Sequence, residues 1–467
     1  MIPAPAPYKP DPAILELADF LGDPVAPARF PVHILRFRND RWDSAVGLGE
    51  LADEDWIRHL GLFEPLPDNL PQPLALRYHG HQFRVYNPDL GDGRGFLYAQ
   101  LRDGAGRLLD LGTKGSGQTP YSRFGDGRLT LKGGVREILA TEMLEALQVN
   151  TSKSFSLIET GEALERNDEP SPTRSSVLVR LSHSHIRIGT FQRLAAQQDR
   201  ENMDRLVRYC LRHYYGEEVE GPVEAAARLM DLVTERAAHL AASYLAAGFV
   251  HGVLNSDNIS ITAESFDYGP WRFTPAWDPM FTAAYFDHQG LYAFGRQPEA
   301  IHWDIVQLAV SLRQIAPADM LVPPLESYAN HFETAFDARM LQRLGVAPLD
   351  PESDRRLATA IQAALEQGGV EIDRFFFDWR GGRLRDPARQ SAYDNEVSAA
   401  LTKIGEDYTP LPGLDHDYWR DDSPCTMHID EVERIWSAID SEDDWSAFEQ
   451  KIADVRRMGE AMSGGAA

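Results

Sequence analysis

The run 251–269 contains three oxygen-bearing side chains whose spacing suits joint chemistry. Its first part reads HGVLNSDN and ends with Asp257 and Asn258, and its last part is the DYG that begins at Asp267. Carboxylate and amide oxygens are ligands that hard divalent cations prefer. We therefore expect Asn258 and Asp267 to share a metal ion, with a short apolar hairpin between them.

Protein kinases place an HRDxxxxN loop and a DFG in the same order, and there the two motifs hold magnesium on the phosphates of ATP. On that pattern, His251 and Asn258 occupy the positions of the kinase histidine and of the metal-binding asparagine. The position of the kinase base is Val253, and the nearest carboxylate is Asp257. The loop is predicted to hold metal-bound ATP without carrying out kinase chemistry from the usual position.

Two glycine-rich segments precede this loop. Segment 91–95 reads GDGRG, and its glycines let backbone N–H groups approach a phosphate while Arg94 adds positive charge. The same glycines also fit an ordinary turn. Segment 115–128 reads GSGQTPYSRFGDGR and is a second candidate for contact with a nucleotide.

Two further pairs of charged residues stand at the ends of predicted elements. Lys114 ends a predicted strand, and Glu137 falls in the first turn of the next predicted helix. Kinases use such a pair to direct an ammonium group at ATP phosphates; a solvated lysine and a glutamate favoured by the helix dipole are the alternative. Arg180 and Arg187 flank segment 181–186, and two converging guanidinium groups would suit a polyphosphate. Surface salt bridges are the alternative for these arginines.

The elements that must position these residues alternate strand and helix, and then become mainly helical. The patterns predict strands over 96–101 and 108–114 joined by a turn at 103–106, a helix over 134–147, a strand over 176–180, and a long helix that ends near Gly248. The chain is therefore expected to be an α+β protein with a protein-kinase-like two-lobed fold and N-terminal and C-terminal extensions. The expected divisions are an N-terminal extension over 1–74, a nucleotide-binding lobe over 75–192, a helical catalytic lobe over 193–345, and a helical C-terminal region over 346–467 with a disordered tail.

Composition limits the classes of partner. The chain of 467 residues carries a net charge of -25, which argues against nucleic acid or an anionic membrane as the main partner because both are polyanions. Two cysteines cannot form a disulfide framework. The proline-rich N-terminus lacks a signal-peptide pattern, and we expect a cytoplasmic protein that acts as a monomer.

The chain resembles the selenoprotein O family, a group of kinase-like proteins. The resemblance rests on strings that occur in the family's order over about half the chain. They are GHQF at 80–83, NPDLGDGR at 87–94, KGSGQTPYSRFGDGR at 114–128, RE at 136–137, SHIRIGTF at 184–191, HGVLNSDNISI at 251–261, DYGP at 267–270 and DHQGLYAFGRQP at 287–298.

This resemblance implies an activity and a role for each candidate residue. The family transfers AMP from ATP to hydroxyl side chains of proteins, with the nucleotide flipped relative to that in kinases. By resemblance, Asp257 would be the base, and Asn258 and Asp267 would hold Mg2+ or Mn2+. The remaining implied residues bind ATP: Lys114, Arg180 and Arg187 at the outer phosphates, Glu137 orienting Lys114, and Gly91, Gly93, Arg94, Asp126, Gly127 and Asp267 in the nucleotide pocket.

The C-terminal region departs from the family pattern. The family's usual final motif and its terminal cysteine or selenocysteine are missing, and Cys425 is no evident substitute. We therefore expect this region to be unlike the family. Three alternatives to AMP transfer remain open: UMP transfer with manganese, a kinase acting on a protein or small molecule, and a non-catalytic nucleotide-binding scaffold.

Overall fold

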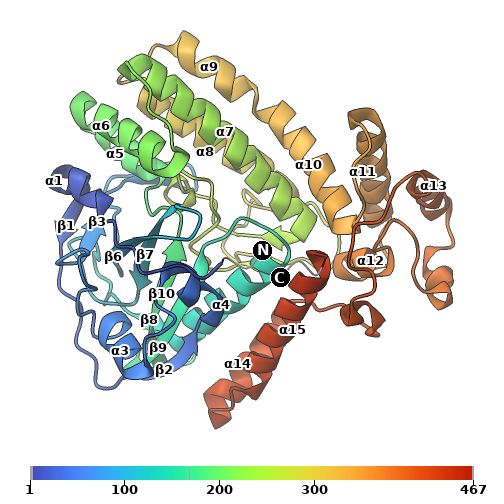
Figure 1. Ribbon diagram of the computed structural model, residues 1–467, viewed down its shortest axis with the longest axis horizontal. Helices are drawn as coiled ribbons and strands as arrows, with labels where there is room; N and C mark the ends of the chain where they lie inside the picture. The colour runs from blue at the N-terminus through green and yellow to red at the C-terminus, as the bar shows by residue number, and fades with distance from the viewer. Residues whose placement is uncertain (1–3, 168, 465–467) are drawn as a thin grey trace.

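The structure, a computed structural model, describes residues 4–167 and 169–464 and has a sheet-rich half and a helical half (Figure 1). The first half is built on an eight-stranded antiparallel sheet with the order β1-β3-β6-β7-β10-β9-β2, in which β8 pairs with β10. Its strands are β1 Gly22–Pro24, β2 Ile34–Arg38, β3 Leu74–Leu76, β6 Leu97–Arg102, β7 Leu108–Lys114, β8 Leu129–Thr130, β9 Lys153–Leu164 and β10 Thr173–Ser182. Two small sheets pair β4 Gly80–Gln82 with β5 Val85–Asn87, and β11 Phe249–Val250 with β12 Arg272–Phe273.

The segment before residue 75 belongs to this sheet. It supplies β1 and β2, and its helices α1 Ala18–Leu21, α2 Asp40–Asp43 and α3 Asp53–Leu60 pack beside the strands. Trp42 and Trp56 join a buried cluster on one face of the sheet. The sequence pattern did not reveal these strands because each is short.

The central hairpin lies close to its predicted position. Strand β7 has the predicted bounds, β6 begins one residue later than predicted, and β10 is longer than the predicted strand. Asp103 fixes the β6–β7 turn, because its side chain accepts hydrogen bonds from the N–H groups of Ala105 and Arg107 at 3.0 and 2.9 Å. Every residue of β7 is buried, so Lys114 at its end lies inside the protein.

Helix α4, Leu131–Ala146, covers the other face of the sheet. Its N-terminus is capped by Thr130, whose hydroxyl accepts a hydrogen bond from Gly133 N–H at 3.1 Å. The helix begins three residues before its predicted start. Glu137 therefore lies in the second turn, and the prediction of the first turn was wrong.

The second half is helical. Its main helices are α5 Ile188–Ala196, α6 Arg200–Cys210, α7 Pro222–Ala247, α8 Gln297–Leu312, α9 Ala318–Glu326 and α10 Tyr328–Leu344. Helix α7 ends before Gly248 as predicted, and the run 251–269 follows it directly. The mixed architecture is that of a kinase-like α+β fold, with a curled sheet and a helical half.

The segment between Asn258 and Asp267 is not the predicted hairpin. Ser260 forms an isolated bridge with Arg187, and Ser265 forms one with Thr151. The segment therefore pairs through Ser260 and Ser265 with parts of the chain that are distant in sequence, and not with itself. This pairing ties the two ends of the segment to the strand-rich half.

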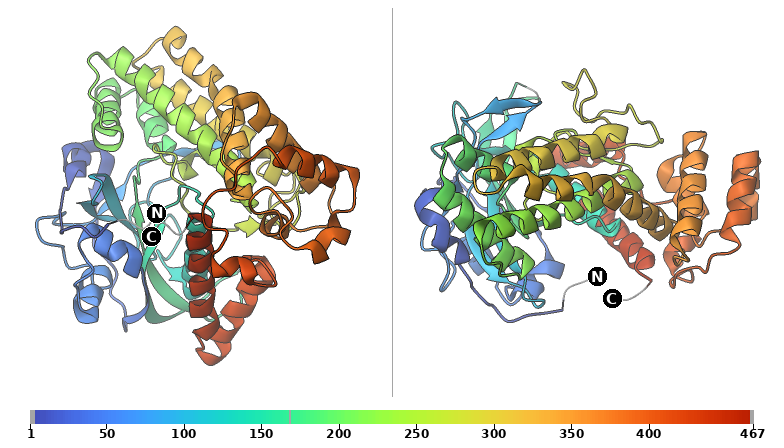
Figure 2. Two further views of the ribbon diagram at one scale, coloured as in Figure 1. Left: turned by 45° about the vertical axis from the view of Figure 1, so that its right-hand side comes forward. Right: turned by 90° about the horizontal axis from the view of Figure 1, so that it is seen from above.

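The C-terminal helices are α11 Pro351–Glu366, α12 Ile372–Asp378, α13 Glu396–Gly405, α14 Ile429–Glu442 and α15 Ser446–Met462. Helices α11 to α13 gather at the end of the helical half, while α14 and α15 return to lie beside α4 (Figure 2). Ion pairs join the two parts, with Lys132 2.7 Å from Glu433 and Arg456 2.9 Å from Glu142. The predicted disordered tail begins at Met462, which is the last residue of α15. Residues 465–467 of this tail lie outside the described residues.

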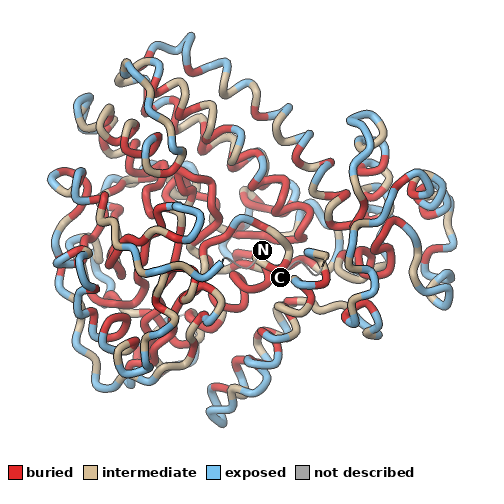
Figure 3. The backbone as a smooth tube through the Cα atoms, in the orientation of Figure 1, coloured by how far each residue is buried: buried red, intermediate tan, exposed pale blue. Residues whose placement is uncertain are grey.

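Burial is concentrated along the sheet, α4 and α7, and the C-terminal helices expose more of their backbone (Figure 3). One large apolar cluster joins α4 to α7 and to α14 and α15. A separate cluster forms among α10 to α13. In the described ranges 4–167 and 169–464, no helix is both long and apolar enough to cross a membrane.

Candidate active site

A cavity of about 780 Å³ lies between the sheet and the loop 251–269. Eleven of the twelve predicted site residues line it, and they come from segments far apart in the sequence. These are Gly91, Gly93, Arg94, Lys114, Asp126, Gly127, Arg180, Arg187, Asp257, Asn258 and Asp267. The twelfth, Glu137, lies behind the wall and contacts Lys114.

Lys114 is held between two carboxylates. Its Nζ lies 2.7 Å from Oε2 of Glu137 and 3.0 Å from Oδ1 of Asp267. Only 4% of Lys114 is exposed, which excludes the alternative of a solvated lysine. The end of β7 and the second turn of α4 thus aim one ammonium group at Asp267.

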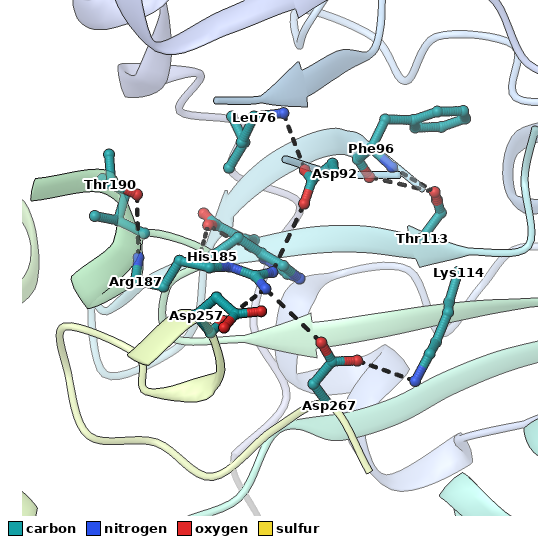
Figure 4. Close-up of polar contacts among 12 residues, drawn as sticks. Leu76, Asp92, Phe96, Thr113, Lys114, His185, Arg187, Thr190, Asp257 and Asp267 are labelled. Carbon is teal, nitrogen blue, oxygen red and sulfur yellow. Dashed lines mark hydrogen bonds and ion pairs between the residues drawn. The ribbon is translucent and has the colours of Figure 1, made fainter. Parts of the chain in front are cut away.

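Two arginines complete the cationic group around Asp267. Arg180 Nη1 lies 3.3 Å from Oδ1 of Asp267. Arg187 Nη1 lies 3.7 Å from Oδ2 of Asp267, and Figure 4 shows this ion pair. Both arginines are buried, so they are not the surface salt bridges of the alternative interpretation. The Arg187 guanidinium lies over the rings of Tyr78 and Phe266 at 4.3 and 4.8 Å, which fixes its plane.

Asp267 is held in the ionised form. Burial by itself would raise its pKa, but Lys114, Arg180 and Arg187 outweigh burial and hold the pKa of Asp267 well below its usual range. Its backbone φ is +67°, a left-handed conformation that non-glycine residues adopt at a cost and that is frequent at functional sites. The carboxylate is therefore a fixed negative charge at the inner end of the cavity.

Asp257 lies in the opposite environment. Burial raises its pKa to about 6, although nearby Arg187 lowers it. Its Oδ1 is buried and has no hydrogen-bond partner among the described residues. Arg187 donates to the backbone carbonyl of Asp257 at 2.9 Å and not to its carboxylate. This carboxylate is free to accept a proton from a group in the cavity.

The strands β4 and β5 fix the loop that carries Asp257. The hydroxyl of Ser256 accepts a hydrogen bond from His81 N–H at 2.7 Å. Asn255 Oδ1 accepts from Phe83 N–H at 3.0 Å and from the Tyr292 hydroxyl at 2.7 Å. A Cβ at Gly80 would lie 2.9 Å from the Asp257 side chain, so only glycine fits there. The motif strings 80–83 and 287–298 thus meet at the loop 251–258.

Val253 occupies the position of the kinase base, and its backbone helps to hold the loop in place. Its carbonyl accepts a hydrogen bond from Asn258 Nδ2 at 3.0 Å, and its N–H lies 3.4 Å from His251 Nδ1. The other ring nitrogen of His251 contacts the Phe266 carbonyl at 2.9 Å, which requires that nitrogen to carry the proton. Burial lowers the pKa of His251, in agreement with this neutral ring. The amide orientation leaves Asn258 Oδ1 available as a ligand.

The two glycine-rich segments pack against each other at the cavity wall. The hydroxyls of Thr119 and Ser122 donate to the carbonyls of Asp92 and Gly93, each at 2.5 Å. A Cβ at Gly91 would lie 2.3 Å from the ring of Tyr121, so the glycine there permits this contact. Segment 91–95 is therefore a turn that also lines the cavity. The ordinary turn and the contact with a phosphate do not exclude each other.

Arg94 and Asp126 lie toward the outside. Arg94 is exposed and lines the cavity. The Asp126 carboxylate is 2.9 Å from Arg166, on the connection between β9 and β10. This ion pair ties the second glycine-rich segment to that connection and so fixes the outer rim.

Sequence reasoning missed Asp92. Its carboxylate accepts a hydrogen bond from Leu76 N–H at 3.0 Å and lies 3.7 Å from Arg187 Nη2 (Figure 4). Asp92 thus helps to position Arg187. The sequence signal for Asp92 was its position between Gly91 and Gly93. Only these glycines and Arg94 were predicted to bind ATP in this segment.

The family model described as protein adenylyltransferase SelO matches residues 7–405. The chain belongs to this family. Membership makes it a nucleotidyltransferase, and most of the strings that carried the resemblance contribute residues to the cavity lining.

Curated relatives match along nearly the whole chain. Protein nucleotidyltransferase YdiU of Synechocystis sp. is 41% identical over 474 residues, which cover 96% of this chain and 97% of the relative. The protein of the same name from Gloeobacter violaceus is 43% identical over 472 residues, with 96% and 95% covered. That from Vibrio cholerae serotype O1 is 36% identical over 352 residues, with 74% and 71% covered.

These alignments bear on the expectation that the C-terminal region is unlike the family. The family model ends at residue 405, but the two longer alignments leave only 4% of this chain uncovered. Most of α14 and α15 therefore lies within these alignments. The departure of the C-terminal region from the family's final motif and terminal cysteine stays a prediction from the sequence.

Proposed function

We propose that this SelO-family enzyme transfers AMP from ATP to serine, threonine or tyrosine hydroxyls of proteins and releases pyrophosphate. The observation that carries the proposal is the pairing of an uncompensated buried carboxylate, Asp257, with three buried cations around Asp267. A base and a polyphosphate site in one cavity are what nucleotidyl transfer requires. The name protein nucleotidyltransferase, which the two relatives carry, supports the nucleotidyl-transfer part of this proposal.

The cations define the phosphate end of the cavity. Lys114, Arg180 and Arg187 are all buried, so they interact strongly with an anion in this weakly screened environment. We assign the β- and γ-phosphates to them. In AMP transfer these two phosphates become the leaving group, and cations placed there stabilise the charge that develops as the bond breaks.

Asp257 acts as the general base. The acceptor oxygen attacks the α-phosphorus and forms a new P–O bond, and the bond from the α-phosphorus to the bridging oxygen of the β-phosphate breaks. The proton of the acceptor hydroxyl passes to the Asp257 carboxylate. A pKa of about 6 leaves this group ionised at neutral pH while keeping it basic enough to take the proton.

Asn258 and Asp267 form a suitable donor set for Mg2+ or Mn2+. Both supply oxygen, and the Asn258 amide is oriented by Val253 so that its oxygen remains available. The described residues contain no cluster of three or more His, Cys, Asp or Glu side chains that could hold a metal. Magnesium commonly takes one or two protein oxygens and completes its shell with phosphates and water. When bound, such a metal supplies charge neutralisation at the phosphates.

A label-transfer assay tests the proposal. The protein is incubated with candidate protein acceptors and ATP labelled at the α- or the γ-phosphate, with magnesium or manganese, and with α-labelled UTP in parallel. Transfer from α-labelled ATP alone, lost in Asp257→Asn, is the expected result. Transfer from the γ-position would make the chain a kinase, transfer from UTP alone would make it a uridylyltransferase, and ATP binding without transfer would make it a scaffold.

A further inference from the structure

The cavity has one aromatic side chain with no partner. Phe124 lines the cavity and is fully exposed, more so than any other large apolar side chain in the described part of the protein. The other two lining aromatics are engaged, because Tyr78 lies under Arg187 and Tyr121 packs on Gly91 and bonds to Asp23. No ring or cation contact is found for Phe124 among the described residues.

A tight turn presents this ring. The N–H of Gly125 donates to the carbonyl of Ser122 at 2.7 Å, which closes a turn with Arg123 and Phe124 at its tip. Arg123 has a φ of +53°, a left-handed conformation that is costly for a residue with a side chain. The turn therefore holds a strained backbone in order to project an apolar ring into water, and neither feature stabilises the fold.

The surroundings of the turn are rigid. The carbonyl of Gly125 accepts a hydrogen bond from Gln118 Nε2 at 2.8 Å. Ser122 is bonded to Gly93, and Asp126 is paired with Arg166 on the facing connection. Ordering of the turn on ligand binding would cost little entropy, because both of its ends are already fixed to the cavity walls.

We propose that Phe124 is the platform on which the nucleobase of the substrate stacks. The inference rests on the proposed function, which assigns the phosphates to the buried cations at the inner end. A nucleotide bound in that direction leaves its base at the outer rim, where Phe124 is the one lining aromatic, among the described residues, with a free face. Stacking on an aromatic ring is available to every base, because each has a π-face.

The isolation of Phe124 favours a base over an acceptor protein as its partner. Its neighbours along the chain are charged or small, namely Arg123, Gly125 and Asp126, so the adjacent residues add no apolar side chain to the ring. The other strongly exposed aromatic, Tyr285, lies outside the cavity lining. A protein interface would need a larger continuous apolar area than one ring supplies.

Calorimetric binding of two probes tests the platform. One probe is ATP with magnesium, and the other is inorganic tripolyphosphate with magnesium, which carries the charge but no base. In Phe124→Ala we expect the affinity for ATP to fall by about tenfold, the scale of one lost base stack, while tripolyphosphate binds as in the wild type. Phe124→Trp should retain ATP binding, and Tyr285→Ala, the matched loss of an exposed aromatic, should change neither affinity.

Fluorescence gives an independent readout. The indole introduced by Phe124→Trp should be quenched by ATP beyond any change in the wild-type protein, and tripolyphosphate should not quench it. Unchanged ATP affinity in Phe124→Ala would overturn the platform, and so would an equal loss of tripolyphosphate affinity or an equal effect of Tyr285→Ala. These measurements need no turnover, so failure of AMP transfer in the label assay would overturn the proposed function separately.

Discussion

Two carboxylates at either end of segment 257–267 lie in opposite electrostatic environments. Asp267 faces Lys114, Arg180 and Arg187, which hold its pKa well below the usual range against the opposing effect of burial. Asp257 has a buried oxygen without a hydrogen-bond partner in the part of the chain that the structure describes, and burial raises its pKa to about 6. The same type of side chain is thus fixed as an anion at one end and poised to bind a proton at the other.

The difference arises from the cations at each carboxylate, because Lys114, Arg180 and Arg187 all lower the pKa of Asp267, whereas Arg187 is the main cation that lowers the pKa of Asp257. The Arg187 guanidinium reaches Asp267 through a side-chain ion pair but meets Asp257 only through the backbone carbonyl. The Asp257 carboxylate therefore receives no hydrogen bond from Arg187, and the hydrogen bond that lowers its pKa comes from its own backbone. Pairs of acids whose environments separate their pKa values are a common way of dividing catalytic roles.

Substitution of Asp267, the ionised carboxylate, should have the largest effect on activity. Asp267→Ala removes the proposed metal ligand and leaves three cations without their shared partner. We expect AMP transfer to fall by about a thousandfold or more, the scale of several kcal/mol of lost charge stabilisation. Transfer assays and magnesium-dependent ATP binding measure this. Exposed Asp407→Asn is the control, and full activity in Asp267→Ala would remove the metal assignment.

Substitution of Asp257, the proposed proton acceptor, should reduce activity somewhat less and should leave the binding of ATP largely unchanged. Asp257→Asn keeps the size of the side chain but cannot accept the proton as a carboxylate does, so the expected loss in kcat is about 10²- to 10⁴-fold. The affinity for magnesium-bound ATP should stay within a few-fold of the wild type. A large loss of affinity with kcat preserved would reverse the roles assigned to the two carboxylates.

Sequence reasoning found these residues but not the contrast between them. The order and spacing of 251–269 predicted Asn258 and Asp267 as metal ligands, because motif chemistry is local, and the family resemblance implied Asp257 as the base. The partners that set each pKa come from elsewhere, with Lys114 on β7 and Arg180 on β10. Their convergence depends on the antiparallel pairing of β7 with β10, which residue spacing alone cannot give.

The fold was predictable where periodicity was long. The hairpin of β6 and β7 and the end of α7 at Gly248 agree with their predicted positions. The segment after Asn258 was misjudged as a hairpin, because an apolar segment that pairs with itself has the same pattern as one that pairs with distant chain. Its bridges to Arg187 and Thr151 are long-range contacts with no local sequence signal.

The pH dependence of turnover should report Asp257 alone. Because its pKa is raised to about 6, the carboxylate is protonated and inactive as a base below that value. With saturating ATP, kcat should rise by about tenfold per pH unit up to pH 6 and then level off. Asp257→Asn should lose this dependence in its residual activity. A midpoint near 4 would show that the carboxylate is solvated, contrary to its burial.

The smallest expected effect is on thermal stability. Its sign should differ between variants at Asp257 and at Asp267. Folding raises the pKa of Asp257, so the ionised form opposes folding at pH 7.5, and a shift of about two units corresponds to roughly 2–3 kcal/mol at most. Asp257→Asn should therefore raise Tm at pH 7.5, with the gain vanishing below about pH 4, where the aspartate is protonated in both states.

Asp267 should behave in the opposite way. Its pKa in the folded state is depressed. Its stabilising contribution is therefore fully present above the pKa of the unfolded state and is lost as the pH falls through the pKa of the folded state. Asp267→Asn removes one of the carboxylates that neutralise the three buried cations and should lower Tm at pH 7.5, because a broken buried ion pair is strongly destabilising. Thermal unfolding of both variants at pH 7.5 and pH 4 measures the signs. Equal shifts of the same sign would mean that the two carboxylates do not differ in the folded protein, and the division between base and anion would have no physical basis.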